Sequence, residues 1–200
     1  MDKNIKISIC IPTNDMDDKS YFLGRCLQSI AEQTYQNFEI ILSKNPGTTM
    51  AYNTNSAIKR AQGEIIKILF MDDFLAHPDA LKNIVENWKG GWLVTGCTHT
   101  HGKDRFNDHL AVYNDNIHQV NTIGSPSVLA FANDEPLLFD ERMNWMLDAD
   151  LYKRLHTRYG EPTILNSLDV VIGIGKHQTT NLLTDEEKNK EMELTNKKHA

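Results

Sequence analysis

The first half of this chain alternates between the hydrophobic period of a strand and that of a helix. Isoleucines at every second position from Ile5 to Ile11 predict a strand, which Pro12 ends. Apolar side chains then recur at helical spacing from Phe22 to Ile30, and Ser20 is the expected N-cap of this helix. A chain that begins in this way must pack its helices against a sheet, because neither element buries its apolar side alone.

The alternation continues to residue 95. The same patterns predict strands at 38–42, 65–70 and 92–95, of which the second is buried. They also predict a helix from Met50 to Ala61, which Gly63 closes, and a helix from Pro78 to Trp88, which Gly90 and Gly91 end. Strands joined by helices in this order imply an α/β fold with a mostly parallel central sheet, flanked by helices on both faces.

Beyond Gly96 the hydrophobic pattern weakens. Residues 97–122 are polar and rich in His and Asn, and we expect loops and short strands there. A strand at 127–132, a helix from Leu147 to Tyr159 that Gly160 ends, and a last strand at 170–174 follow. Residues 185–200 are charged with few apolar anchors, so we expect a solvated helix or a disordered tail after a single domain at 1–184.

Composition excludes some classes of protein. The 200 residues are 40% hydrophobic and 24% charged, as in ordinary globular domains, and the net charge of −6 argues against nucleic acid as the main partner. No run of about eighteen apolar residues and no apolar signal region occur, so we expect no transmembrane segment and a cytoplasmic protein. The three cysteines lack the spacing of a disulfide framework, which fits a reducing compartment.

Two adjacent aspartates, Asp72 and Asp73, follow the buried strand that ends at Phe70. The carboxyl end of a parallel strand faces the crevice where α/β proteins bind ligands, and paired carboxylates there can hold a hard divalent cation against a phosphorylated substrate. An alternative is that the two aspartates only shape a turn through side-chain-to-backbone hydrogen bonds.

Several fragments together resemble glycosyltransferase family 2, the nucleotide-sugar transferases of the GT-A fold, over about residues 5 to 180. They are SICIPTN at 8–14, LGRCLQSI at 23–30, EQTYQNFEII at 32–41, AYNTNSAIKRAQGE at 51–64, the acidic pair at 72–73, FDER at 139–142 and LDADLYKRL at 147–155. The resemblance implies the GT-A fold and transfer of a sugar from a nucleotide-diphosphate donor.

Two departures from the family pattern bear on the site. Phe70 stands where the family's acidic motif has its first acid, so that Asp72 must carry the metal contact while Asp73 binds ribose, a metal-bound water or its own backbone. The second strand ends in SKNPG at 43–47, where the family has an acidic segment that holds the base and ribose.

The resemblance also implies roles for residues outside the acidic pair. Pro12, Thr13, Asn14 and Asp15 would line the nucleotide cleft, and Asn53 would approach the ribose or diphosphate. His177 would join Asp72 as a ligand of Mn²⁺ or Mg²⁺. The alternative for this segment is that Lys176, beside His177, neutralises the leaving diphosphate. Isolated Asn and Asp residues in a strand-to-helix connection more often serve as turn formers, and a lone histidine is more often a surface residue.

Asp148 is the expected catalytic base, because inverting transfer needs a carboxylate that takes the proton of the acceptor hydroxyl. It lies near the start of a helix, where backbone dipoles favour its ionised form, and we expect it to be deprotonated at neutral pH. Asp150 points about 200° further round the helix and is not expected to share this role. The alternative for Asp148 and Asp150 is that both are ordinary acidic residues at the N-terminus of a helix, without a catalytic role.

The sequence therefore predicts a metal-dependent, inverting glycosyltransferase that uses a UDP-, GDP- or dTDP-sugar, a divalent cation and a glycan or other hydroxyl acceptor. The incomplete acidic motif leaves a non-catalytic nucleotide-sugar or glycan-binding module as an alternative. A zinc-dependent hydrolase is a third possibility, since Cys97, His99 and His101 alternate along one predicted strand face.

Overall fold

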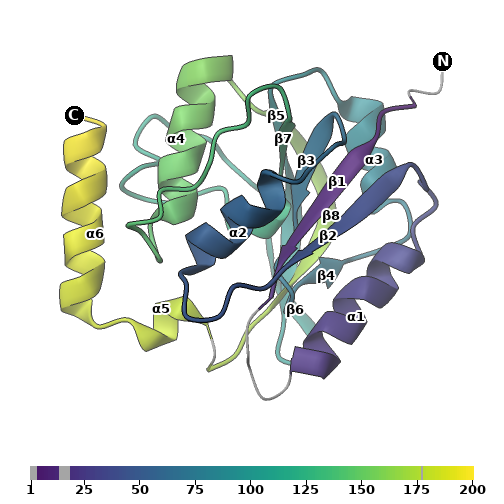
Figure 1. The fold of residues 1–200 in the computed structure, drawn as a ribbon, viewed down its shortest axis with the longest axis horizontal. Coiled ribbons are helices and arrows are strands. Elements are labelled where there is room, and N and C mark those ends of the chain that lie inside the picture. Colours follow the sequence, from purple (N-terminus) through teal and green to yellow (C-terminus); the bar gives the residue numbers. More distant parts are fainter. Residues whose placement is uncertain (1–3, 14–18, 177) are drawn as a thin grey trace.

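The computed structural model describes residues 4–13, 19–176 and 178–200. Within these ranges the strands form one sheet in the order β2-β1-β3-β7-β5-β8-β4, with β6 paired to β5 (Figure 1). The strands are β1 (Ile7–Pro12), β2 (Phe38–Ser43), β3 (Ile65–Ile68), β4 (Phe74–Leu75), β5 (Trp92–Thr100), β6 (Arg105–His109), β7 (Leu129–Ala132) and β8 (Thr163–Gly173).

The sheet is mostly parallel in direction, as expected. Strands β2, β1, β3, β5 and β8 run one way, and β7, β4 and β6 run the other way. Strand β7 enters between β3 and β5 and is antiparallel to both. The carboxyl ends of the parallel strands therefore meet at one edge of the sheet, where α/β proteins bind ligands.

Helices cover both faces of the sheet (Figure 1). They are α1 (Lys19–Ala31), α2 (Met50–Ile58), α3 (Ala80–Asn87), α4 (Leu147–Tyr159), α5 (Thr179–Leu182) and α6 (Asp185–Lys198), and a 3₁₀ helix η1 (Pro126–Val128) precedes β7. Helices α2 and α4 lie on one face, and α1 and α3 on the other. The core between these layers consists of fully buried aliphatic side chains of the strands, such as Ile9, Ile66 and Leu93.

Some element boundaries differ from those expected. Helix α1 already begins at Lys19, so Ser20 lies inside its first turn and is not its N-cap. Helix α2 ends at Ile58 rather than at Ala61. Gly63 instead allows the entry to β3 to approach β1, because a Cβ at this position would lie 2.6 Å from the carbonyl oxygen of Lys6.

Strands β5 and β8 are longer than the sequence predicts, because they pair with each other from Leu93 opposite Thr163 to Thr100 opposite Gly173. The strand expected at 127–132 is reduced to β7, since η1 occupies its first residues. Helix α4 has the expected bounds and ends at Gly160, whose φ of 76° suits a residue without a side chain.

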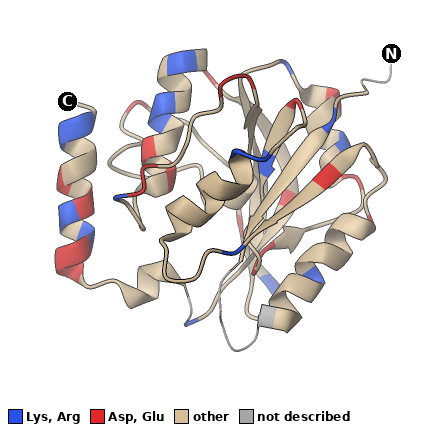
Figure 2. Cartoon of the chain, viewed as in Figure 1, with Lys and Arg blue, Asp and Glu red and all other residues tan. Residues whose placement is uncertain are grey.

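The charged segment 185–200 forms helix α6 and is not simply solvated. The side chain of Thr184 caps its first turn in a reciprocal arrangement with Glu187. Glu191 and Thr195 are buried against the rest of the chain. Figure 2 shows that α6 carries acidic and basic side chains, whereas α2 carries none. No described helix is both long and apolar enough to cross a membrane.

Candidate active site

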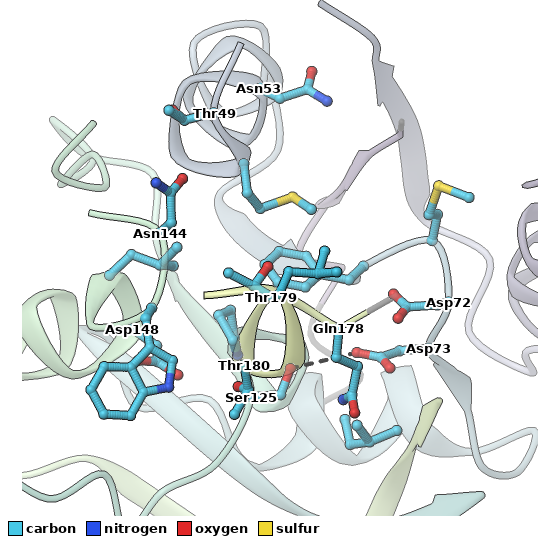
Figure 3. Close-up of a pocket in the computed structure, with 18 of the residues that line it drawn as sticks. Thr49, Asn53, Asp72, Asp73, Ser125, Asn144, Asp148, Gln178, Thr179 and Thr180 are labelled. Carbon is cyan, nitrogen blue, oxygen red and sulfur yellow. Dashed lines mark hydrogen bonds between the residues drawn. The ribbon is translucent and has the colours of Figure 1, made fainter. Parts of the chain in front are cut away.

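A pocket of 860 Å³ opens at the carboxyl ends of β1, β2 and β3. The start of α2, the loop 119–126, the start of α4 and helix α5 complete its walls. Figure 3 shows Asp72 and Asp73 on one side of this pocket, Asn144 and Asp148 on the opposite side, and Thr179 and Thr180 of α5 between them. Two acidic groups from distant parts of the sequence thus face one cavity.

The two aspartates at the end of β3 differ in environment. Asp72 is half-buried and lines the pocket. Asp73 is 3% exposed, and its carboxylate accepts hydrogen bonds from the backbone N–H of Gly173 at 2.8 Å and from the Ser125 hydroxyl at 3.5 Å. Burial, followed by the charge of Asp72, raises the pKa of Asp73 well above its usual range. Asp73 is therefore a poor candidate for an ionised ligand, and Asp72 has the more open position in the pocket.

The turn that carries the aspartates packs closely against β8. A Cβ on Gly173 would lie 2.4 Å from the carbonyl oxygen of Asp72. The same carbonyl accepts a hydrogen bond of 2.9 Å from the guanidinium of Arg25, which lies over the Phe74 ring. Only glycine fits at position 173 without moving the acidic turn.

This close approach predicts the effect of Gly173→Ala. The new methyl group must displace backbone, so we expect the free energy of unfolding to fall by about 1–3 kcal/mol, measured by denaturant unfolding. Gly24→Ala is the matched control, because Gly24 has nothing within 4 Å of its added Cβ and lies in a helix. Helix propensity should make that variant slightly more stable. Equal stabilities of the two variants would contradict the packing described here.

Asn53 of α2 joins the ends of the first two strands. Its side-chain N–H₂ donates to the carbonyl of Thr13 at 2.6 Å, and its side-chain oxygen accepts from Asn45 at 3.0 Å. Asn45 also donates to the Ser43 hydroxyl at 3.1 Å. The segment after β2 is thus held by the side-chain amides of Asn45 and Asn53, and it lacks the acidic residues that glycosyltransferase family 2 has there. Lys44, in the same segment, lines the pocket.

Asp148 lies in the first turn of α4 and is half-buried. Its carboxylate accepts hydrogen bonds from the Asn121 side chain at 2.8 Å and from the backbone N–H of Ala149 at 2.7 Å. Burial is the main influence on its ionisation and raises its pKa to about 7. The expectation that Asp148 is deprotonated at neutral pH did not allow for this burial, whose cost exceeds the stabilisation by backbone N–H groups.

Asp150 faces away from the pocket, as its position on the helix predicts. Its carboxylate is fully buried and pairs with Arg154 at 2.7 Å, Lys198 at 2.8 Å and His199 at 2.9 Å. The last two partners belong to the end of the chain. Asp150 therefore joins α4 to the segment that contains α6.

The structure brings five of the predicted site residues to the pocket: Thr13, Asn53, Asp72, Asp73 and Asp148. Pro12, which is buried in β1, and Lys176, which is exposed, are not among its lining residues. Asn14, Asp15 and His177 lie outside the described residues, and their roles remain predictions.

Sequence reasoning missed several residues of this site. Asn121, Ser125 and Thr179 reach it from loops and a short helix without a motif that signals them. Lys67 does not line the pocket but interacts electrostatically with Asp73, and it did carry a signal, because a lysine within a predicted buried strand needs a reason. Its ammonium donates to the carbonyls of Ser127 and Leu129. Burial lowers its pKa to about 7, although the charges of Asp169 and Asp73 oppose this shift.

The described residues do not form the zinc site that was the third possibility around Cys97. Among residues 4–13, 19–176 and 178–200, no three His, Cys, Asp or Glu side chains are placed to hold a metal. Burial raises the pKa of the Cys97 thiol to about 11, which disfavours the thiolate that zinc needs. His99 and His101 instead contact the carbonyls of Asn107 and Ile174.

Several solved structures of glycosyltransferases share this architecture. Residues 1–349 of S. aureus TarS in complex with UDP-GlcNAc match 96% of this chain with a TM-score of 0.67 and 14% identity, and the match spans 65% of that chain. The same protein in complex with UDP matches 98% of this chain at a TM-score of 0.63 and 14% identity, over 72% of its own length.

The mannosyltransferase PcManGT from Pyrobaculum calidifontis, in complex with GDP-Man and Mn²⁺, matches 86% of this chain at a TM-score of 0.57 and 17% identity. The match spans 57% of PcManGT and 65% of the TarS chain in the UDP-GlcNAc complex. This chain therefore covers less than two thirds of the length of either of these two chains. No protein-family model matches the chain, and no curated protein matches it in sequence.

These similarities show the class of fold. The chain has the GT-A fold, with a mostly parallel curled sheet flanked by helices, as the sequence resemblance implied. The acidic pair at the end of β3 and the facing Asp148 lie in the pocket at the ligand-binding edge of this fold.

Proposed function

We propose that this protein is a metal-dependent, inverting glycosyltransferase that transfers a sugar from a nucleotide-diphosphate donor to an acceptor hydroxyl. The observation that carries the proposal is one GT-A pocket with Asp72 and Asp73 on one side and Asp148 on the other. TarS bound to UDP-GlcNAc and PcManGT bound to GDP-Man support a nucleotide-sugar donor.

The residues present fit a divalent cation. Mg²⁺ and ions like it bind through one or two carboxylates together with substrate phosphates, so a complete protein cage is not needed. Asp72 offers such a carboxylate, and Lys44 is the only Lys or Arg among the described residues that line the pocket. A cation held by Asp72 would neutralise the donor diphosphate, and the Mn²⁺ in the PcManGT complex supports this ion.

Asp148 has the position and chemistry of the base. Its carboxylate takes the proton of the acceptor hydroxyl as the acceptor oxygen forms a bond to the anomeric carbon. The bond from that carbon to the diphosphate breaks, and its electron pair leaves with the nucleoside diphosphate. Attack from the side opposite to the leaving group inverts the anomeric centre. Asn121, which donates to Asp148, keeps the carboxylate oriented.

A donor screen tests the proposal. We expect one of the UDP-, GDP- or dTDP-sugars, with Mn²⁺, to raise the melting temperature, and the same donor to release nucleoside diphosphate when hydroxyl acceptors are added. Binding of a donor without transfer to any of a panel of glycans would favour the non-catalytic binding module. No binding of any nucleotide sugar would refute both the transferase and the nucleotide-sugar-binding module.

The raised pKa of Asp148 predicts a pH dependence. A base must be deprotonated, so kcat should rise with pH through about 7. In Asp148→Asn this rise, which is the acid limb of the pH profile, should be absent. The contribution of Asp148 to the free energy of unfolding should change in the opposite direction and fall as the pH rises. Because burial raises the folded-state pKa above the ordinary 3.8, the contribution of Asp148 to stability is complete below that value and is lost as the pH rises through about 7. A kcat independent of pH between 5 and 8, with chemistry rate-limiting, would contradict the assignment.

A further inference from the structure

A single buried carboxylate from α6 binds the backbone that leads into α4. Glu191 is 8% exposed. Its Oε1 accepts the N–H of Asn144 at 2.9 Å, and its Oε2 accepts the N–H groups of Trp145 at 2.7 Å and of Met146 at 2.9 Å. Three consecutive backbone donors thus converge on one side chain, which comes from a segment about 45 residues further along the chain.

The bound segment is a wall of the pocket. Asn144, Trp145 and Met146 all line it, and Asp148 follows two residues later. Met146 occupies the N-cap position of α4 and makes no side-chain capping bond. Glu191 accepts the N–H of this N-cap residue and of the two residues before it, while Asp148 accepts the N–H of Ala149 in the first turn, and the negative charge of Glu191 lies at the positive end of the helix dipole. Charge-assisted bonds of this kind hold backbone more firmly than neutral ones.

A second contact fixes α6 along α4. Lys198 and His199, at the end of α6, pair with the buried Asp150, and Lys198 also pairs with Asp140 at 2.8 Å. Figure 1 shows α6 alongside α4 on the outer side of the molecule. Two separate contacts therefore join the segment that contains α6 to the start and the first turn of α4.

We propose that Glu191 is a positioning residue that holds the Asn144–Asp148 wall, and with it the carboxylate of Asp148, opposite the acidic pair. This inference rests on the proposed function, because Asp148 needs a fixed position only if it acts on a bound acceptor. A displacement of about 1 Å at a reacting group can cost about 10²-fold in rate. Glu191 acts through Asp148 and does not itself line the pocket.

Two variants separate the hydrogen bonds of Glu191 from its charge. Glu191→Gln removes the charge and one of the two acceptor oxygens, so the N–H of Asn144 or those of its neighbours lose their partner. Glu191→Asp keeps the charge, but the carboxylate is one methylene too short to reach. Glu193→Gln is the matched control, because Glu193 is exposed on the same helix. Circular dichroism and thermal melting establish that each variant is folded.

Amide hydrogen exchange of the full chain measures the wall directly and needs no substrate. We expect exchange at Asn144, Trp145 and Met146 to be at least about tenfold faster in Glu191→Gln and Glu191→Asp than in the unaltered chain or in Glu193→Gln. Unchanged exchange in both variants would overturn the proposal.

Kinetics then distinguish positioning from general stability. Both variants should lose at least about tenfold in kcat while the Kd of the donor nucleotide stays within about twofold, because the donor side of the pocket is built by other elements. Asp148 interacts electrostatically with Glu191 of α6 and with Tyr152 of α4. Removing the charge of Glu191 should move the acid limb of kcat to lower pH in Glu191→Gln, and Glu191→Asp should leave this limb in place.

The outcomes are distinct. Faster exchange with an unchanged kcat would overturn the positioning role and leave Glu191 as a purely structural residue. If the unaltered chain transfers no sugar from any donor, the proposed function fails, and Glu191 then has no catalytic role, whatever the exchange data show about the wall.

Discussion

Asp148→Asn is expected to lower kcat at least about a hundredfold, while the Kd of the donor nucleotide and the melting temperature stay close to those of the unaltered protein. Asparagine keeps the shape of the side chain and an oxygen that can accept the N–H of Asn121, but it cannot take a proton. General-base catalysis contributes about 10²–10⁴-fold to rate. Steady-state kinetics and nucleotide calorimetry measure the two quantities separately.

The control for this prediction must be a carboxylate outside the pocket. Asp115→Asn serves, because Asp115 is exposed and does not line the cavity. Asp150→Asn does not, since loss of a buried ion-pair partner is expected to lower the free energy of unfolding by about 3 kcal/mol. If Asp148→Asn transfers sugar as fast as Asp115→Asn once donor and acceptor are known, Asp148 is only a helix-terminal charge.

Asp72→Asn is expected to abolish the contribution of a divalent cation to nucleotide binding. The pocket is acidic, and a diphosphate that enters it meets the charge of Asp72 unless a cation reverses the sign of that interaction. Calorimetry of UDP and GDP should therefore show tight binding only with Mn²⁺ or Mg²⁺, and Asp72→Asn with metal should bind as weakly as the unaltered protein in EDTA.

Asp73→Asn is the matched control for this experiment. An asparagine at position 73 retains an oxygen for the N–H of Gly173, and the pKa of Asp73 is already raised by burial, so the loss of nucleotide affinity should be smaller. His177→Ala is expected to fall between the unaltered protein and Asp72→Asn. Equal affinity with EDTA and with Mn²⁺ in the unaltered protein would show that the site binds nucleotide without metal.

Local pattern was enough to predict much of the fold. The period-two isoleucines of β1, the helical stripe of α1 and the glycine that ends α4 each act within a few residues, and the structure has these elements where the sequence predicts them. Parallel strands place their carboxyl ends at one edge, so the position of Asp72 at the pocket also followed from the sequence.

Long-range pairing could not be predicted in the same way. The second half of β5 is polar, and it forms a strand because β8 lies beside it, about 70 residues later. Strand β7 inserts antiparallel between β3 and β5, an arrangement that no local period specifies. The interpretation of Cys97, His99 and His101 as metal ligands failed for this reason, since spacing along a strand does not tell which neighbours surround the side chains.

By itself, the sequence determined the order of the longer strands and helices and the place of the acidic pair, because these depend on hydrophobic period and on the direction of strands. The GT-A class of fold followed from the resemblance of its fragments to glycosyltransferase family 2, whereas the short elements β4, β6 and α5 were not predicted. Only the tertiary structure decided that burial raises the pKa of Asp148 and that Glu191 of the charged tail accepts the backbone N–H groups beside it. Burial and backbone hydrogen bonding depend on groups that are distant in sequence, and a linear pattern of residue types does not contain those distances.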